Sequence, residues 1–153
     1  MTKVLMICHG SICRSPMARY VLRDMVDKMG IGDEFVIESA ATSREELGNP
    51  VYPPARQKLA EHGIDCRGYA ARQMKASDYD EFDYIIGMDS ENMYYMKRLW
   101  PEDPESKLSL LMDYTERPRE VADPWYTRDF EATWRDVNDG CTGFLRELGY
   151  FSE

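Results

Sequence analysis

A cysteine and an arginine with five residues between them, Cys8 and Arg14, lie near the start of the chain. The apolar run 4–7 before them indicates a buried strand, and Ser15-Pro16 after them is typical of a helix start. Gly10, between the two, permits a tight reversal of the backbone. This order predicts a loop whose backbone N–H groups face one point in front of a helix N-terminus.

Such a loop binds a tetrahedral oxyanion, because its N–H groups and the positive end of the helix dipole both attract negative charge. Its candidate phosphate-binding residues are His9, Gly10, Ser11, Ile12, Cys13, Arg14 and Ser15. The same field would stabilise Cys8 as the thiolate, the nucleophilic form of cysteine. The planar guanidinium of Arg14 would contact two oxygens of the anion. A lone cysteine often only packs, so the prediction rests on the strand before and the helix start after it.

A catalytic acid is expected further along the chain. A thiolate that attacks a phosphate ester must expel an alkoxide or phenolate, and a neutral acid nearby makes this step easier. Asp123 is the candidate, because Pro124 stiffens the backbone after it and two aromatic residues that can stack on a phenyl ring follow. Other aspartates in this part of the chain lack that aromatic setting: Asp113, Asp129 and Asp136.

The elements that would position these groups alternate between strand and helix patterns. Strands are predicted at 3–7, 34–40, 84–88 and 107–111, and helices at 16–29, 54–61, 90–100 and 129–148. The alternation favours an α/β sandwich with a parallel sheet. Two long loops, about 41–53 and 112–128, both follow strands, so we expect them beside the Cys8 loop at the carboxyl edge of the sheet.

Short motifs along almost the whole chain match one known family. They are residues 8–16, 39–42, 48–50, 71–73 and 82–86, Met88-Asp89 with Asn92, and residues 123–126. In these motifs the chain resembles the low-molecular-weight protein tyrosine phosphatases. The resemblance implies a three-layer sandwich with a four-stranded parallel sheet, flavodoxin-like or phosphotyrosine phosphatase I-like, and residues 1–153 as a single catalytic phosphatase domain.

The resemblance also implies an activity, the hydrolysis of phosphotyrosine and aryl phosphates in two steps. Cys8 becomes a cysteinyl-phosphate while Asp123 protonates the leaving phenol and Arg14 holds the phosphoryl oxygens. Water activated by Asp123 then releases inorganic phosphate. The expected substrate rim consists of Glu45, Trp125 and Tyr126.

A disulfide and a second substrate class also follow from the resemblance. A reversible Cys8–Cys13 disulfide would protect the thiolate from over-oxidation, although Cys13 as a small packed side chain fits the sequence equally well. Ile12 favours a tyrosine phosphatase, since a threonine there goes with protein-arginine phosphatases of the same fold, the alternative reading.

Several positions depart from the family pattern. Ser11 replaces the usual asparagine, and Tyr69 stands where a histidine is common. We therefore expect the Tyr69 hydroxyl to support the loop through Ser11 or Ser39. His9 is expected to be a solvated loop histidine. Glu45 replaces an apolar wall and, with Glu46, would make one side of the entrance acidic, which weakens ring stacking and disfavours acidic peptides.

The composition excludes several classes of protein. A net charge of −9 and a pI near 4.8 argue against nucleic acid or an anionic membrane as a partner. The four cysteines at 8, 13, 66 and 141, with only two histidines, show no zinc-ligand spacing, so we expect no metal and no cofactor. No apolar run approaches a membrane span and the N-terminus is too short for a signal peptide. We expect a cytoplasmic monomer that acts on a phosphotyrosine-containing protein or peptide.

Three other functions share part of the pattern. An arsenate reductase of the same fold needs two further cysteines in the middle of the chain, and residues 67–140 contain none. A cysteine phosphocarrier would need neither Arg14 nor Asp123, and it leaves the motif 123–126 unexplained. A pure oxyanion-binding module would not need Asp123 as an acid.

Overall fold

A parallel sheet of four strands, in the order β2-β1-β3-β4, forms the centre of the fold. The computed structural model describes residues 1–151. Its strands are β1 Thr2–Cys8, β2 Phe35–Ala41, β3 Tyr84–Gly87 and β4 Leu108–Leu110. Its α-helices are α1 Arg14–Lys28, α2 Pro53–Glu61, α3 Asp78–Glu81, α4 Ser90–Leu99, α5 Pro124–Thr127 and α6 Phe130–Glu147, and its 3-10 helices are Gly32–Glu34 and Leu111–Tyr114.

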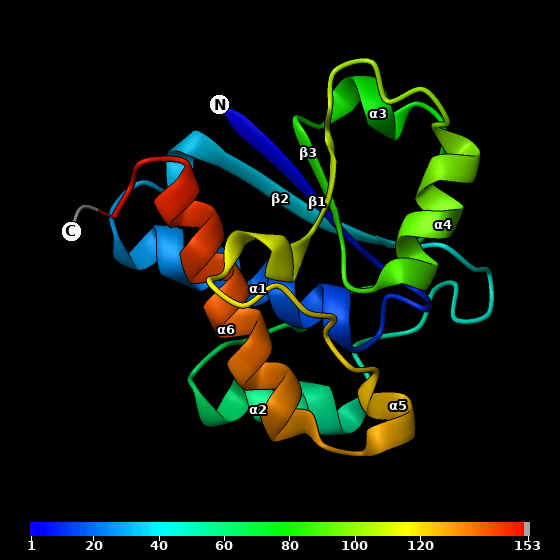
Figure 1. The fold of residues 1–153 in the computed structure, drawn as a ribbon. Coiled ribbons are helices and arrows are strands. Elements are labelled where there is room, and N and C mark those ends of the chain that lie inside the picture. The colour runs from blue at the N-terminus through cyan, green and yellow to red at the C-terminus, as the bar shows by residue number, and fades with distance from the viewer. Residues whose placement is uncertain (152–153) are drawn as a thin grey trace.

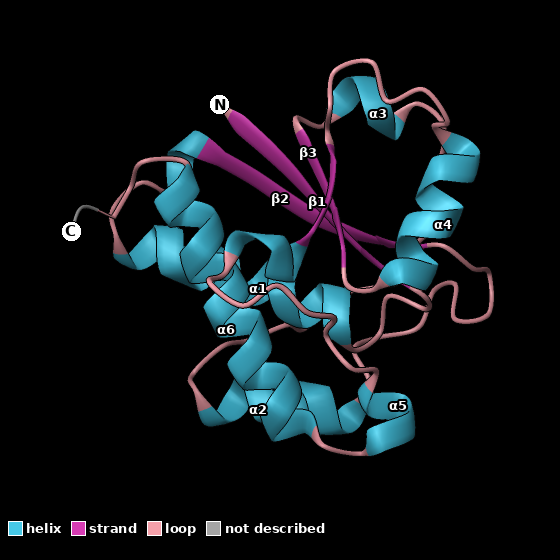
Figure 2. Ribbon diagram, in the orientation of Figure 1, coloured by secondary structure: helices cyan, strands magenta, loops and turns pink. Residues whose placement is uncertain are grey.

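Helices cover both faces of this sheet, as Figures 1 and 2 show. On one face α1 packs against β1 and β2, and α2 and α6 pack against α1. On the other face α4 contacts β3 and β4, and α3 lies beyond it. The expected three-layer α/β sandwich with a four-stranded parallel sheet is confirmed.

The central strand β1 is buried on both faces, which explains its unbroken apolar run. Val4 and Met6 belong to the core under α1 and α6, whereas Leu5 and Ile7 belong to the core under α3 and α4. All four side chains are fully buried. Because side chains alternate along a strand, Cys8 follows Val4 and Met6 and faces α1 at the carboxyl end of β1.

Every predicted strand and helix is present, with its ends shifted by no more than two residues. The patterns missed α3, α5 and both 3-10 helices, because a single turn is too short to show a hydrophobic period. The segment 112–128 was expected to be a plain loop. It contains α5 and most of the 3-10 helix Leu111–Tyr114.

Both long loops lie beside Cys8 at the carboxyl edge of the sheet, as expected. In the first loop, the Thr42 N–H donates to the Cys8 carbonyl at 3.0 Å. In the second, the Val121 N–H donates to the carbonyl of Met88, just after β3, also at 3.0 Å. Within residues 1–151, none of the helices combines the length and the apolar character that crossing a bilayer requires.

Candidate active site

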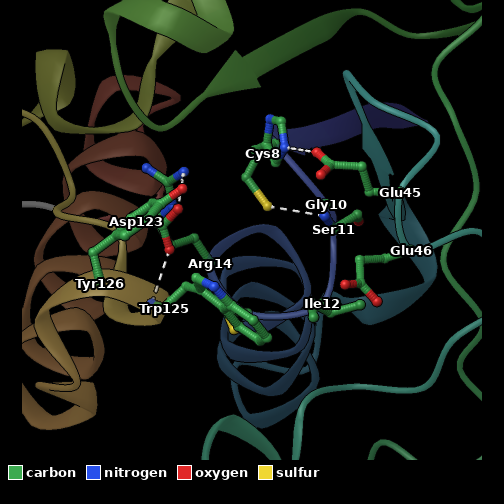
Figure 3. Close-up of a pocket in the computed structure, with 12 residues that line it drawn as sticks. Cys8, Gly10, Ser11, Ile12, Arg14, Glu45, Glu46, Asp123, Trp125 and Tyr126 are labelled. Carbon is green, nitrogen blue, oxygen red and sulfur yellow. Dashed lines mark hydrogen bonds and ion pairs between the residues drawn. The ribbon is translucent and has the colours of Figure 1, made fainter.

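A pocket opens at this edge of the sheet, and four segments of the chain line it (Figure 3). The loop after β1 supplies its floor, the start of α1 supplies Arg14, and the two long loops supply its walls. The lining residues are Cys8, His9, Gly10, Ser11, Ile12, Cys13, Arg14, Glu45, Glu46, Asp123, Trp125 and Tyr126. All the predicted catalytic and rim residues therefore meet in one pocket, and Ser15, which does not line it, contacts Cys8 from behind.

The sulfur of Cys8 is surrounded by hydrogen-bond donors. The backbone N–H groups of Ser11 and Ser15 point at Sγ from 3.3 and 3.4 Å. The Ser15 hydroxyl lies 3.1 Å from the same sulfur. A thiolate can only accept hydrogen bonds, so these groups favour the nucleophilic form of Cys8.

The start of α1 explains why these N–H groups are available. The helix begins at Arg14, and Cys13 occupies its N-cap position. Pro16 is therefore the third helical residue, whereas the sequence pattern suggested that it is the first. N–H groups of the first helical turn have no partner within the helix. The Ser15 N–H is one of them, and it is free to point at the sulfur.

The tight reversal of the loop occurs at Ser11 and not at Gly10. Ser11 has a φ of 56°, in the left-handed region. Gly10 has a different role, because a Cβ at this position would lie 3.1 Å from Cγ of Glu46, a tight contact from which that side chain would have to shift. Its missing side chain leaves room for the wall of the pocket.

A buried hydroxyl network supports Ser11, as predicted from the unusual Tyr69. The Tyr69 hydroxyl donates to the Ser11 carbonyl at 2.6 Å and accepts from Ser39 Oγ at 3.1 Å. It also lies 2.7 Å from Ser11 Oγ, which lies 2.9 Å from Ser15 Oγ. Burial raises the pKa of Tyr69 although its serine hydrogen bonds oppose this, so the phenol stays neutral. The network connects β2 to the hydroxyl that contacts Cys8.

Arg14 is buried and is held from two sides. Its Nη1 donates to Asp89 Oδ2 at 2.6 Å and to the Val121 carbonyl at 2.9 Å, and its Nη2 lies 3.5 Å from Asp123 Oδ2. Burial alone would lower the pKa of Arg14, but Cys8, Asp89 and Asp123 raise it overall, so the group stays a cation.

The contact with Asp89 was not expected from the sequence. Asp89 caps α4 by accepting from the Asn92 N–H at 2.8 Å, a pattern visible in the sequence as an Asp followed three residues later by Asn. That pattern indicated only a helix start. Its second role, holding Arg14, depends on a contact across 75 residues of sequence.

Asp123 lies at the N-cap of α5, and its side chain is one-quarter exposed. It accepts from the Trp125 N–H at 3.0 Å and lies beside the guanidinium of Arg14 in the pocket (Figure 3). The less favoured aspartates have structural partners elsewhere. Asp113 accepts from the Leu110 N–H, Asp129 caps α6, and Asp136 pairs with Arg119.

The rim of the pocket has an aromatic side and an acidic side. Trp125 is 45% exposed and Tyr126 is 81% exposed, so both rings are accessible to a substrate. On the other side His9 is not simply solvated as expected, because it pairs with Glu45 and its Nδ1 lies 3.6 Å from Glu91. His9 thus joins the loop after β1 to the first long loop and to α4.

The second cysteine of the loop is chemically different from the first. Burial, together with the nearby charges of Cys8 and Asp123, raises the pKa of Cys13 well above its ordinary value. Cys13 therefore stays a neutral thiol at physiological pH. Within residues 1–151 all four cysteines are unpaired, and the reversible Cys8–Cys13 disulfide stays a prediction.

Comparisons with known proteins agree with this geometry. Residues 3–150 match the family described as low molecular weight phosphotyrosine protein phosphatase. The chain is 38% identical to low molecular weight phosphotyrosine protein phosphatase 1 of Drosophila melanogaster, over 95% of this chain and 96% of that one. It is 36% identical to the low molecular weight protein-tyrosine-phosphatase YfkJ of Bacillus subtilis, covering 97% of this chain and 96% of its relative. The crystal structure of YfkJ superimposes with a TM-score of 0.94 at 36% identity, over 97% of this chain and 95% of that one.

Proposed function

The chain belongs to the low-molecular-weight phosphotyrosine protein phosphatase family, and we propose that the pocket around Cys8 is its active site. The protein is a protein-tyrosine phosphatase, a hydrolase whose substrates are phosphoproteins and whose product is inorganic phosphate. One observation carries the assignment of the site. The sulfur of Cys8, the guanidinium of Arg14 and the carboxyl group of Asp123, from three segments, face one pocket.

In the first step the Cys8 thiolate attacks the phosphorus of phosphotyrosine. The S–P bond forms while the bond between phosphorus and the phenolic oxygen breaks, and Asp123 gives its proton to that oxygen. Negative charge on the phosphoryl oxygens is held by Arg14 and by N–H groups of the loop. Asp89 keeps one side of the guanidinium occupied, so Nη2 is the nitrogen left facing the pocket.

In the second step water attacks the cysteinyl-phosphate. Asp123, now a carboxylate, takes a proton from this water, and the S–P bond breaks to release phosphate. The departing sulfur regains negative charge, which the hydroxyl of Ser15 at 3.1 Å can stabilise by donating to it. Ser11 Oγ, 2.9 Å from Ser15 Oγ, then donates to Ser15 and sets this direction.

The shape of the pocket supports phosphotyrosine over phosphoserine. Cys8 is only 3% exposed, and two rings stand at the mouth, Trp125 and Tyr126. A phenyl ring spans the distance from such a mouth to the sulfur and stacks on the rim, whereas a serine side chain is shorter and has no ring. Ile12 lines the pocket, where the protein-arginine phosphatases of this fold carry a threonine, so tyrosine is the substrate side chain we favour.

We further propose that the enzyme acts as a monomer in the cytoplasm. The proposed catalytic groups Cys8, Arg14 and Asp123 all belong to one chain, so the proposed chemistry needs no second copy. The nucleophile must remain a reduced thiol, which a reducing compartment provides.

Turnover of p-nitrophenyl phosphate by the wild type and three variants tests the proposal. The wild type should give steady multiple turnovers, and Cys8→Ser should abolish them while still binding phosphate. Asp123→Asn should lower the rate by about 10²–10⁴, the usual contribution of a general acid or base. Asp113→Asn, a change at an aspartate outside the pocket, is the matched control and should keep the wild-type rate.

Each contrary result would change a different part of the proposal. A single burst of product without turnover would indicate a phosphocarrier, and binding without any product would indicate an oxyanion-binding module. Near-normal activity of Asp123→Asn would mean that another group is the acid. A higher kcat/KM for phosphoarginine peptides than for phosphotyrosine peptides would favour the protein-arginine phosphatase.

A further inference from the structure

Arg128, which ends the short helix α5, holds an unfavourable backbone conformation. Its φ is 60°, in the left-handed region that residues with a Cβ seldom adopt. Its own N–H closes the helix by donating to the Pro124 carbonyl at 2.8 Å. Contacts of the side chain must therefore compensate for this backbone conformation.

The guanidinium of Arg128 lies among three aromatic rings. Its central carbon is 5.5 Å from the ring centre of Tyr52, 5.9 Å from that of Trp125 and 6.0 Å from that of Phe130. It also donates hydrogen bonds to the Tyr52 hydroxyl at 3.1 Å and to the Trp125 carbonyl at 3.5 Å. Arg128 thus connects α5 to a residue 76 positions earlier in the chain.

Tyr52 is itself fixed to the loop of the nucleophile. Its backbone N–H donates to the Ile12 carbonyl at 2.8 Å, and its ring packs on Trp125 with centres 4.9 Å apart. The N–H of Trp125 donates to the Asp123 carboxylate. A continuous set of contacts therefore runs from Ile12 through Tyr52, Arg128 and Trp125 to Asp123.

The other end of the same segment is held separately. Before Asp123, the carbonyl of Val121 accepts from Arg14, and the Val121 N–H donates to Met88. Arg128 joins the two sides of the rim, because its side chain donates to the Tyr52 hydroxyl on one side and to the Trp125 carbonyl of α5 on the other. The position of the Asp123 carboxyl group relative to the Cys8 sulfur therefore depends on contacts at both ends of the segment 121–128.

We infer that Arg128 is a positioning residue, which sets Asp123 at the right distance from the leaving oxygen by fastening α5 onto Tyr52. The inference rests on the proposed function, because it assigns Arg128 to the proton-transfer part of that reaction. Proton transfer requires heavy atoms within hydrogen-bond reach, and a displacement of about 1 Å can cost about 10² in rate.

Substrates with different leaving groups separate positioning from general stability. Phenyl phosphate expels a basic phenoxide and needs the proton, whereas p-nitrophenyl phosphate expels a more acidic phenol and needs it less. Arg128→Ala should lower kcat/KM by about tenfold for phenyl phosphate and by less than about threefold for p-nitrophenyl phosphate. Arg128→Lys keeps a cation over the rings and should recover part of the loss.

A double-mutant cycle tests whether Arg128 acts through Asp123. In an Asp123→Asn background, Arg128→Ala should cause no further loss with phenyl phosphate, because the acid it positions is already gone. Tyr52→Phe keeps the ring, removes the hydroxyl that accepts from Arg128 and should show the same selective loss, so the test survives if Arg128→Ala does not fold. The matched control is Arg23→Ala, since Arg23 also makes two side-chain hydrogen bonds, to the carbonyls of Gly32 and Phe35, at the other end of α1.

The outcomes separate the inference from the function on which it rests. A wild type without turnover would contradict the proposed function and the inference with it. An active wild type in which Arg128→Ala loses both substrates equally, or loses activity further in the Asp123→Asn background, would overturn the inference alone.

Discussion

Cys8 and Cys13 lie in one loop, yet their surroundings give them different chemistry. Cys8 receives two backbone N–H groups and a hydroxyl at its sulfur. Cys13 is buried beside negative charge, which raises its pKa and keeps it protonated. The nucleophile is therefore selected by the donors that point at it and not by the presence of a thiol.

Ser11 and Tyr69 show how a loop can keep its shape with other residue types. Ser11 occupies a left-handed conformation without the asparagine side chain that tolerates it well. The Tyr69 hydroxyl contacts both the carbonyl and the hydroxyl of Ser11 in the buried network. One phenol thereby holds the residue whose N–H points at Cys8.

Replacing Tyr69 by phenylalanine should weaken both folding and catalysis. The Ser11 carbonyl and the Ser39 hydroxyl would lose a buried partner, which costs about 1–3 kcal/mol in the free energy of unfolding. We also expect a lower kcat with p-nitrophenyl phosphate, since Ser11 and Ser15 would be held less firmly. Urea unfolding and steady-state kinetics of Tyr69→Phe measure the two effects.

The control for this change is Tyr20→Phe. The ring of Tyr20 packs edge-on against Tyr69 with centres 6.1 Å apart, but its hydroxyl is not part of the serine network. The Tyr20→Phe variant should have a free energy of unfolding and a kcat close to those of the wild type. Equal behaviour of the two variants would show that the Tyr69 hydroxyl does not support the loop.

At the scale of elements, the pair α2 and α6 supports the aromatic side of the rim, because α2 begins directly after Tyr52. Lys58 on α2 donates to Glu131 on α6 at 2.9 Å, and it also donates to Glu61. Beyond the end of α2, His62 stacks on Trp134 of α6 with ring centres 3.8 Å apart. These contacts fix the helix that has Tyr52 as its N-cap.

The pH dependence of stability should reveal the Lys58–Glu131 contact. The hydrogen bond from Lys58 lowers the pKa of Glu131 in the folded protein. The unfolded chain then binds the proton more tightly, so the contact stabilises above the ordinary glutamate pKa of about 4.3 and is lost as pH falls through the lower folded value. Glu131→Gln should therefore lower the urea midpoint at pH 7 and match the wild type near pH 3.

A matched control for this prediction is Glu102→Gln. Glu102 is an exposed glutamate in the segment before β4, away from the α2–α6 pair. The Glu102→Gln variant should show the same difference in urea midpoint between pH 7 and pH 3 as the wild type. A Glu131→Gln variant as stable as the wild type at pH 7 would contradict the predicted role of this contact.

At the scale of the whole molecule, an acidic protein binds an anionic substrate. The net charge is −9, yet the floor of the pocket has N–H groups and a buried arginine cation. Charges farther away than a Debye length of about 8 Å are largely screened at physiological salt. Affinity for the phosphate therefore depends on the floor, whereas preference among peptides depends on the rim.

The acidic side of the rim should make the enzyme prefer basic phosphopeptides. Glu45 and Glu91 both lie beside His9, and their side chains are 66% and 65% exposed. A lysine next to phosphotyrosine should raise kcat/KM over a glutamate by about two- to fivefold at low salt, as expected for exposed charge pairs. The difference should shrink at 0.5 M salt, because ions screen exposed charges.

Variants locate the origin of this preference. Glu45→Gln should reduce the ratio between the lysine and the glutamate peptide. Asp33→Asn changes the same charge in the 3-10 helix before the amino end of β2, far from the pocket mouth along the sheet, and should keep the ratio. The same reduction in both variants would assign the preference to net charge instead of the rim.

The sequence by itself determined the α/β class, the positions of its main strands and helices, and the loop that presents Cys8 and Arg14. Each of these depends on local signals, namely a short apolar run, a helical period or a helix start, which a few neighbouring residues carry. The motif around Asp123 was found for the same reason. The catalytic roles of Cys8, Arg14 and Asp123, and residues 1–153 as a single domain, stay predictions.

Only the tertiary structure decided which distant residues hold the reacting groups. Asp89 beside Arg14, Tyr69 beneath Ser11 and Arg128 on Tyr52 are contacts across 75, 58 and 76 positions of the chain. No local pattern encodes such pairs, because they arise when parallel strands bring their carboxyl ends and the following loops to one edge. The tight reversal was expected at Gly10 and occurs at Ser11 for a related reason, since a buried hydroxyl network from elsewhere in the fold stabilises the left-handed conformation of Ser11.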